Sequence, residues 1–123
     1  MGKKILVVGD SQKDLAAIRR QLKKYGYDRV ELIRTARETL QKIRSNPPAL
    51  AIVNTQISDG DGYDVCKQIR KMNLDHMKII LLNSLGEMNN AQRAREVGAD
   101  DLVVKTSDYL FLMNTIRKIL PPE

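Results

Sequence analysis

Apolar residues occur along the chain in two alternating patterns. Short runs of consecutive apolar residues, rich in Val, Ile and Leu, are typical of strands that are buried on both faces of a sheet. Between these runs, apolar residues recur every three or four positions, which predicts helices with one buried face. Such runs predict strands at residues 4–8, 49–54, 77–83 and 101–104, and an alternation of apolar and polar residues predicts a fifth strand at 29–34.

Each predicted strand is followed by a helical pattern, so strand and helix alternate five times. Gly26, Gly98 and the Pro121-Pro122 pair end three of the helices, as residues with poor helix propensity do. The alternation predicts an α/β fold, (βα)5, in which a doubly wound five-stranded parallel sheet has helices on both faces. The apolar helix positions are Leu15, Ile18, Leu22 and Tyr25; Ala36, Leu40 and Ile43; Val65, Ile69 and Met72; Ala91, Ala94 and Val97; and Leu110, Met113, Ile116 and Leu120.

Polar residues follow four of the predicted strands. In a doubly wound sheet, ligands and chemistry lie at the carboxyl ends of the strands, so these residues are expected to meet along one rim. A carboxylate, two amides, two hydroxyls and a lysine converge there. The rim residues are Gly9, Asp10, Asn54, Asn83, Ser84, Lys105 and Thr106.

The motifs of common nucleotide-binding and hydrolytic sites are absent at this rim. Gly9 is followed by D-S-Q-K-D-L, without the second glycine and the Gly-Lys pair that a phosphate-binding loop needs. Neither a G-x-G-x-x-G nor a G-x-S-x-G sequence occurs. Ser11 is better explained as the N-cap of the first helix.

Composition and charge limit the number of domains and the kinds of ligand that this chain can have. The 123 residues are enough for one domain, which we place at 1–120, with 121–123 as the start of a linker or the chain end. No apolar run approaches a membrane span, the one cysteine (Cys66) fits a core position, and the one histidine (His76) gives no metal cluster. We expect a cytoplasmic protein. The net charge of +6 is spread over helices, and the aromatic content of 4% argues against single-stranded nucleic acid as a ligand.

Four segments together resemble the receiver domain of two-component response regulators. ILVVGDSQKDLAAIRRQL resembles the first strand and helix, and PALAIVNTQISDGDGYDVCKQIR resembles the third strand, phosphorylation loop and third helix. KIILLNS resembles the fourth strand, and EVGADDLVVKTSD resembles the stretch around the last strand. The resemblance covers nearly the whole chain and implies a flavodoxin-like receiver fold.

Several positions depart from the receiver pattern. Gly9 and Asp10 replace the usual acid pair, so only the second acid remains, and Asn54 stands at the position of the phosphoacceptor aspartate. Ser58 replaces the loop proline, while the Asp-Gly pair that begins the third helix is kept at 61–62.

The departures continue along the later strands. The resemblance aligns Asn83, followed by Ser84, with the switch threonine or serine, and Leu102 with the switch aromatic residue. Lys105 is kept, but Thr106 replaces the cis-proline that usually follows it.

These replacements predict a pseudo-receiver that has the fold without the usual chemistry. The Asn54 amide is a poor nucleophile, so no aspartyl phosphate is expected there and no enzymatic activity. Without two acids, Mg²⁺ binding is expected to be weak or absent, with Asp10 as the only residual candidate ligand, paired with Lys105 or solvated. No other cofactor is expected.

The expected function is regulatory signalling through protein–protein contact. The expected partners are a histidine kinase, an output domain or a second copy of the chain, through a surface formed by Arg93, Arg95, Leu102, Tyr109 and Arg117. Two alternatives stay open. One is a conventional phosphorelay receiver with an unorthodox acceptor such as Thr55 or Ser84. The other is a nucleic-acid-binding or small-molecule sensor domain, although nucleic acid is not expected as a partner of this domain alone.

Overall fold

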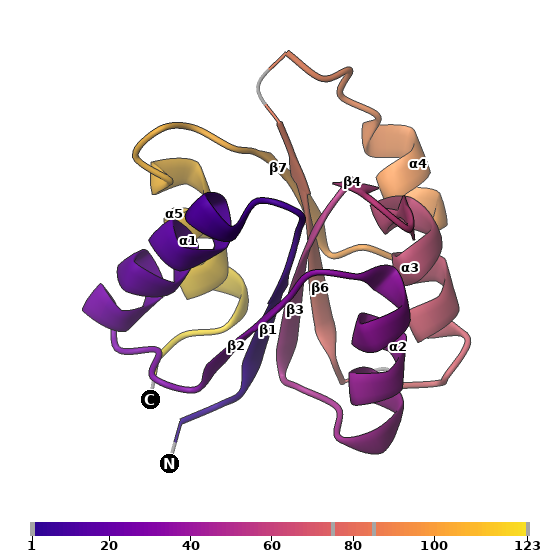
Figure 1. The fold of residues 1–123 in the computed structure, drawn as a ribbon, viewed down its shortest axis with the longest axis horizontal. Coiled ribbons are helices and arrows are strands. Elements are labelled where there is room, and N and C mark those ends of the chain that lie inside the picture. Colours follow the sequence, from indigo (N-terminus) through magenta and orange to yellow (C-terminus); the bar gives the residue numbers. More distant parts are fainter. Residues whose placement is uncertain (1, 75, 85, 123) are drawn as a thin grey trace.

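The computed structural model describes residues 2–74, 76–84 and 86–122. Five parallel strands form the central sheet in the order β2-β1-β3-β6-β7 (Figure 1). This order confirms the predicted doubly wound α/β fold. The strands are β1 (Ile5–Val8), β2 (Val30–Ile33), β3 (Leu50–Asn54), β6 (Lys78–Asn83) and β7 (Asp101–Val104). Each parallel strand is followed by a helix, namely α1 (Gln12–Lys24), α2 (Ala36–Ser45), α3 (Gly62–Arg70), α4 (Ala91–Glu96) and α5 (Leu110–Ile119).

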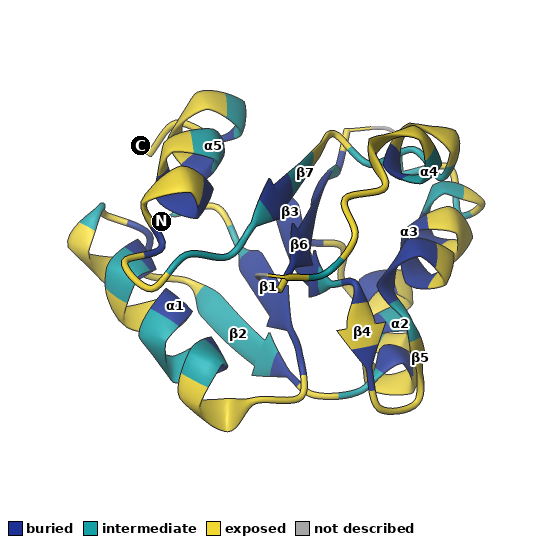
Figure 2. Cartoon of the chain, turned by 90° about the horizontal axis from the view of Figure 1, so that it is seen from above, coloured by how far each residue is buried: buried dark blue, intermediate teal, exposed yellow. Residues whose placement is uncertain are grey.

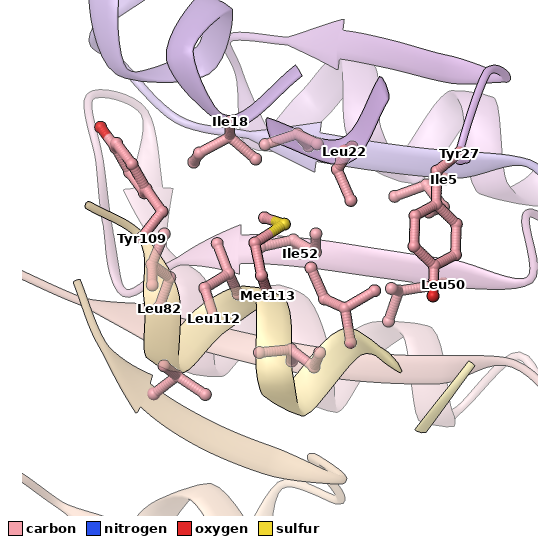
Figure 3. Packing of buried hydrophobic residues seen from close by; sticks show 14 of the residues in the cluster. Ile5, Ile18, Leu22, Tyr27, Leu50, Ile52, Leu82, Tyr109, Leu112 and Met113 are labelled. Atoms are coloured by element: carbon pink, nitrogen blue, oxygen red, sulfur yellow. The ribbon is translucent and has the colours of Figure 1, made fainter. Parts of the chain in front are cut away.

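The helices cover the sheet in two layers. In Figure 1, α1 and α5 lie on one face of the sheet, and α2, α3 and α4 lie on the other. Alternate residues of the strands point to opposite faces. Ile5 and Val7 therefore pack under α1 and α5, whereas Leu6 and Val8 pack under the other three helices. Figure 3 shows the first of these cores, in which Ile18 and Leu22 of α1 approach Met113 of α5.

The predicted first residues of two helices are confirmed by their capping contacts. Ser11 is the N-cap of α1, and its hydroxyl accepts a hydrogen bond from the Asp14 amide. Asp61 caps α3 in the same way, through the Tyr63 amide. Such caps satisfy amide groups that have no partner within the helix.

A short hairpin between β3 and α3 was not predicted from the sequence. It pairs β4 (Gln56–Ile57) with β5 (Gly60–Asp61), two residues each, which is too short for a recognisable alternation of apolar and polar positions. Asp59 in its turn accepts hydrogen bonds from the Ala36 and Arg37 amides. The hairpin therefore connects the start of α2 to the loop after β3.

One of the apolar positions predicted to be buried in α5, Leu110, was wrong, whereas Met113, Ile116 and Leu120 are buried as predicted. Leu110 was expected in the core but is 48% exposed, whereas Tyr109 is 8% exposed. Tyr109 has a left-handed backbone conformation (φ 57°) immediately before the helix, which turns its ring inward (Figure 3). Cys66, in contrast, is fully buried as predicted, and burial raises the pKa of its thiol to about 12.

Within the described residues, no helix has both the length and the apolar character needed to cross a membrane.

Candidate functional site

The predicted rim lies at the upper edge of the sheet in Figure 1, where the parallel strands end. A cavity of about 180 Å³ opens there. It brings together Asp10, Asn54, Ser84 and Lys105 from four strand ends, as predicted. The full lining comprises Asp10, Ser11, Asp14, Asn54, Gln56, Leu82, Ser84 and Lys105.

Asn54 ends β3, and its side chain occupies the space beside Gly9. A Cβ atom placed on Gly9 would overlap Asn54 Nδ2 and would lie 3.1 Å from Asn54 Cγ. Any side chain at position 9 therefore requires the Asn54 side chain to turn. The two departures from the receiver pattern are physically linked, because Gly9 makes the room that Asn54 occupies.

Asp10 holds two loops together. Its carboxylate Oδ1 accepts a hydrogen bond from the Ser58 amide at 2.8 Å, and its backbone carbonyl accepts one from Arg34 Nη2 at 3.2 Å. The first contact connects the loop after β1 to the hairpin after β3. The side chain is exposed, but it is not simply solvated, and Lys105 is not its partner.

Lys105 pairs with Asp14, a residue of α1. The ammonium Nζ lies 2.5 Å from Asp14 Oδ2, and the Tyr109 hydroxyl donates to the other oxygen, Oδ1, at 3.2 Å. The Lys105 hydrogen bond is the main reason that the pKa of Asp14 lies below its ordinary value. Asp14 was not among the predicted rim residues, because it lies on a helix and not at a strand end. Asp14 lies three residues after the Ser11 N-cap, and this position in the first turn of α1, close to the end of β1, is the sequence feature that could have indicated it.

Asp14→Asn is expected to lower the free energy of unfolding at neutral pH by about 1 kcal/mol, as partly exposed ion pairs do. Because the pKa of Asp14 is depressed in the folded state, this stability is present above the unfolded-state pKa and is lost as the pH falls through the folded-state pKa. The difference between wild type and variant should therefore shrink below about pH 4. Urea unfolding followed by circular dichroism between neutral and acidic pH measures it. A difference that does not change with pH would contradict this ion pair.

The loop after β6 brings a third carboxylate, that of Glu87, next to the rim. Glu87 Oε2 accepts a hydrogen bond from the Thr55 hydroxyl at 2.5 Å, and Oε1 accepts one from the Ser84 amide at 3.0 Å. Thr55 is only 3% exposed. Asn83 is fully buried beside this loop, and its Nδ2 lies 3.4 Å from the Met88 carbonyl. Glu87 was also missed, because a loop carboxylate follows no periodic pattern.

Comparison with known proteins identifies the family. The family model described as the response regulator receiver domain matches residues 5–117. The chain belongs to this receiver family. Receivers of this kind are signalling modules.

Curated relatives are regulators that are longer than this receiver. The probable transcriptional regulator ycf27 of Pyropia yezoensis is 34% identical over 117 residues, which cover 95% of this chain and 47% of the relative. The alkaline phosphatase synthesis transcriptional regulatory protein PhoP of Bacillus subtilis is 33% identical over 105 residues, which cover 85% of this chain and 43% of PhoP. The chain thus spans about half the length of these relatives.

Solved receiver structures have the same fold. The BeF3-activated DrrB receiver domain has a TM-score of 0.81 at 26% identity and covers 98% of both chains. The response regulator TrrA of Thermotoga maritima, in complex with Mg²⁺-BeF, has a TM-score of 0.85 at 28% identity, covering 96% of this chain and 99% of TrrA.

The rim of this receiver does not fit a magnesium ion well. Mg²⁺ is usually bound through one or two carboxylates at nearly octahedral geometry. Here the Asp10 carboxylate accepts a backbone amide hydrogen and the Asp14 carboxylate is paired with Lys105, while Gly9 and Asn54 supply no charged oxygen. Across residues 2–74, 76–84 and 86–122, no three Asp, Glu, Cys or His side chains cluster as a metal site would require.

The expected interaction residues do not form one surface. Arg93 is turned toward α3: its guanidinium carbon lies 4.4 Å from the centre of the Tyr63 ring, and Nη2 lies 3.0 Å from Asp61 Oδ2. Arg117 stacks on Tyr25 of α1, 5.0 Å from the ring centre. Tyr109 is buried and cannot contact a partner without rearrangement.

Arg95 and Leu102 do lie together, unlike Arg93 and Arg117. Arg95 is exposed and Leu102 is partly buried. Both line a depression of about 280 Å³ between α4 and β7, together with Asn89, Ala91, Ala94, Ala99, Asp100 and Asp101.

Proposed function

We propose that this receiver signals without aspartyl phosphorylation, through contact with a protein partner. The observation that carries the proposal is Asn54 at the end of β3, with its amide against Gly9. An aspartyl phosphate is an acyl phosphate, and its formation requires a carboxylate oxygen as the attacking atom. The Asn54 side chain offers a carboxamide in its place.

The contacts of Lys105 support the same proposal. A lysine at such a rim can neutralise the charge of a phosphoryl oxygen. In this chain the Asp14 carboxylate already neutralises it, and the Tyr109 hydroxyl binds the same carboxylate. The rim is therefore held together by the chain's own side chains.

A substitute acceptor is disfavoured at Thr55. Its hydroxyl is buried and donates its hydrogen to Glu87, so a phosphodonor would first have to displace the loop after β6. Ser84 is exposed, and its side chain remains the alternative that the experiment below would detect.

We place the partner surface at the depression between α4 and β7. Arg95 supplies an exposed charge there, and Leu102 supplies an apolar contact, the combination of polar rim and apolar centre that protein interfaces use. The partner is a histidine kinase or an output domain, or a second copy of the chain. Residues 1–120 act as one folded unit in this proposal.

The proposal is tested by exposing the wild-type chain to acetyl phosphate and Mg²⁺ and then measuring its intact mass. We expect the unmodified mass, because neither the acceptor nor the metal ligands are available. An added phosphoryl group, located by peptide mapping to Ser84, Thr55 or another residue, would replace this proposal with a phosphorelay through an unorthodox acceptor.

A further inference from the structure

The outer face formed by α1 and α5 carries an excess of exposed positive charge. The two helices contain seven basic residues and a single acidic one, Asp14, whose carboxylate is already neutralised by Lys105. All seven are exposed, and none takes part in a salt bridge among the described residues. They are Lys13, Arg19, Arg20, Lys23, Lys24, Arg117 and Lys118.

The opposite face of the molecule is different. Helices α2, α3 and α4 also contain seven basic residues, but they include three acidic residues, Glu38, Asp64 and Glu96. Three of the seven basic side chains are in salt bridges: Lys42 with Glu31, Arg70 with Asp100, and Arg93 with Asp61. The charge that lacks a counter-ion is therefore concentrated on the α1–α5 face.

The two helices form one continuous surface. Figure 2 shows α1 and α5 on the same side of the sheet. They touch near both ends, through the Tyr109–Asp14 hydrogen bond and through the stacking of Arg117 on Tyr25. The second contact places an α5 guanidinium next to the end of α1.

The basic residues of α1 are arranged along the helix. Lys13, Arg20 and Lys24 lie opposite its buried side, which consists of Leu15, Ile18 and Leu22. At 1.5 Å per residue, this stripe is about 16 Å long. Arg19 and Lys23 line a depression of about 380 Å³ beside it, together with Tyr27, Asp28 and Val30.

The basic stripe of α1 has none of the apolar anchors that a protein interface uses. Binding energy between proteins comes mainly from a few buried aromatic or apolar side chains. The large exposed apolar residues of this face, Leu110 and Phe111, lie in the first turn of α5, and none lies among the basic residues of α1. Lysine and arginine alone suffice for a phosphate backbone, where the release of counter-ions drives binding.

Against the expectation from the sequence that nucleic acid is not a partner of this domain, we propose that the α1–α5 face binds the phosphate backbone of double-stranded nucleic acid without reading its base sequence. The proposal rests on charge and surface geometry at one face and not on the state of Asn54, so it stands or fails separately from the proposed function. Among the residues that line the depression, Asp28 is the one acidic residue, and the other four carry no negative charge.

The test is fluorescence anisotropy of a labelled duplex of mixed sequence, with the intact chain at several salt concentrations. The variant Lys13→Glu/Arg20→Glu/Lys24→Glu should bind at least about tenfold more weakly at low salt, and its salt slope should be lower by about 3. The control Arg44→Glu/Lys67→Glu/Lys71→Glu has the same net charge, and its exposed residues lie on or just after α2 and α3. The affinity of this control variant for the duplex should fall by less than about threefold. The matching triple Gln variants, checked by circular dichroism, provide the same comparison if a Glu variant is misfolded.

The proposal is overturned by any of three outcomes. One is no binding of the duplex by wild type at low salt. Another is an equal loss in the two charge variants, which would show that net charge alone is responsible. The third is stronger binding to polyglutamate or to vesicles containing phosphatidylserine than to the duplex, which would assign the face to an acidic protein or a membrane surface.

Discussion

Asn54→Asp alone is expected to leave the receiver essentially unphosphorylated by acetyl phosphate and Mg²⁺. The variant regains an acceptor carboxylate at position 54. The one other acid at the strand ends that form the rim is Asp10, whose carboxylate already accepts a hydrogen bond from the Ser58 amide. Lys105 remains paired with Asp14. An added negative charge beside Asp10, without a well-held cation, also raises the cost of approach by an anionic donor.

The matched comparison is the double variant Gly9→Asp/Asn54→Asp, which restores both acids. A side chain at position 9 forces the side chain at position 54 to turn, because the two occupy the same space. We expect phosphorylation of the double variant to be at least about tenfold faster than that of Asn54→Asp, since a second carboxylate improves Mg²⁺ binding. A time course of intact mass measures the phosphorylation rate of each variant. Ready phosphorylation of Asn54→Asp would show instead that Asn54 is the only lesion in this site.

Gly62→Ala is expected to reduce the free energy of unfolding by about 3 kcal/mol or more, as severe overpacking does. A Cβ atom at Gly62 would overlap the backbone carbonyl oxygen of Asn54 and would lie 2.9 Å from Thr55 Cα. These are backbone atoms next to a buried strand, and they cannot move aside as a flexible side chain could. The Gly62 amide also donates to the Thr55 carbonyl at 2.9 Å, which fixes this approach.

Gly60→Ala is the control for this effect. Gly60 lies two residues earlier, in β5, and its added Cβ would lie 3.4 Å from Ala36 Cβ, an ordinary contact. Its stability should change by less than about 1 kcal/mol. Urea unfolding of the three proteins, followed by circular dichroism, gives the comparison. Equal midpoints for Gly62→Ala and wild type would contradict the close packing of the first residue of α3 against the end of β3.

The strand order and the rim could be predicted because they follow from short-range pattern and chain topology. Buried parallel strands consist of apolar runs, and their carboxyl ends meet at one edge of the sheet. This pattern predicts Asp10, Asn54 and Lys105 at that edge, where they line the same cavity. The interactions among them were not predictable in the same way. The partner of Lys105 is Asp14, which reaches the rim from a helix whose rotation depends on core packing.

The interaction surface was predicted least well, because exposure depends on details that periodicity does not contain. Tyr109, which has a left-handed backbone conformation just before α5, lies in the core, whereas Leu110 in the first turn is exposed. Arg93 has the sequence position of a surface charge, yet Tyr63 and Asp61 hold it against α3. Charge reversal at Arg93 would therefore disturb the packing of α4, and Arg95 is the better probe of a partner surface.

The most direct test of a phosphorylation-independent receiver is a time course of intact mass with acetyl phosphate and Mg²⁺, with the receiver TrrA of Thermotoga maritima treated in parallel. TrrA was solved in complex with Mg²⁺-BeF, so it is the suitable positive control. We predict that the wild-type chain keeps its unmodified mass under conditions in which TrrA gains a phosphoryl group. A phosphoryl adduct on the wild-type chain, accumulating at a rate similar to that of TrrA, would contradict the account.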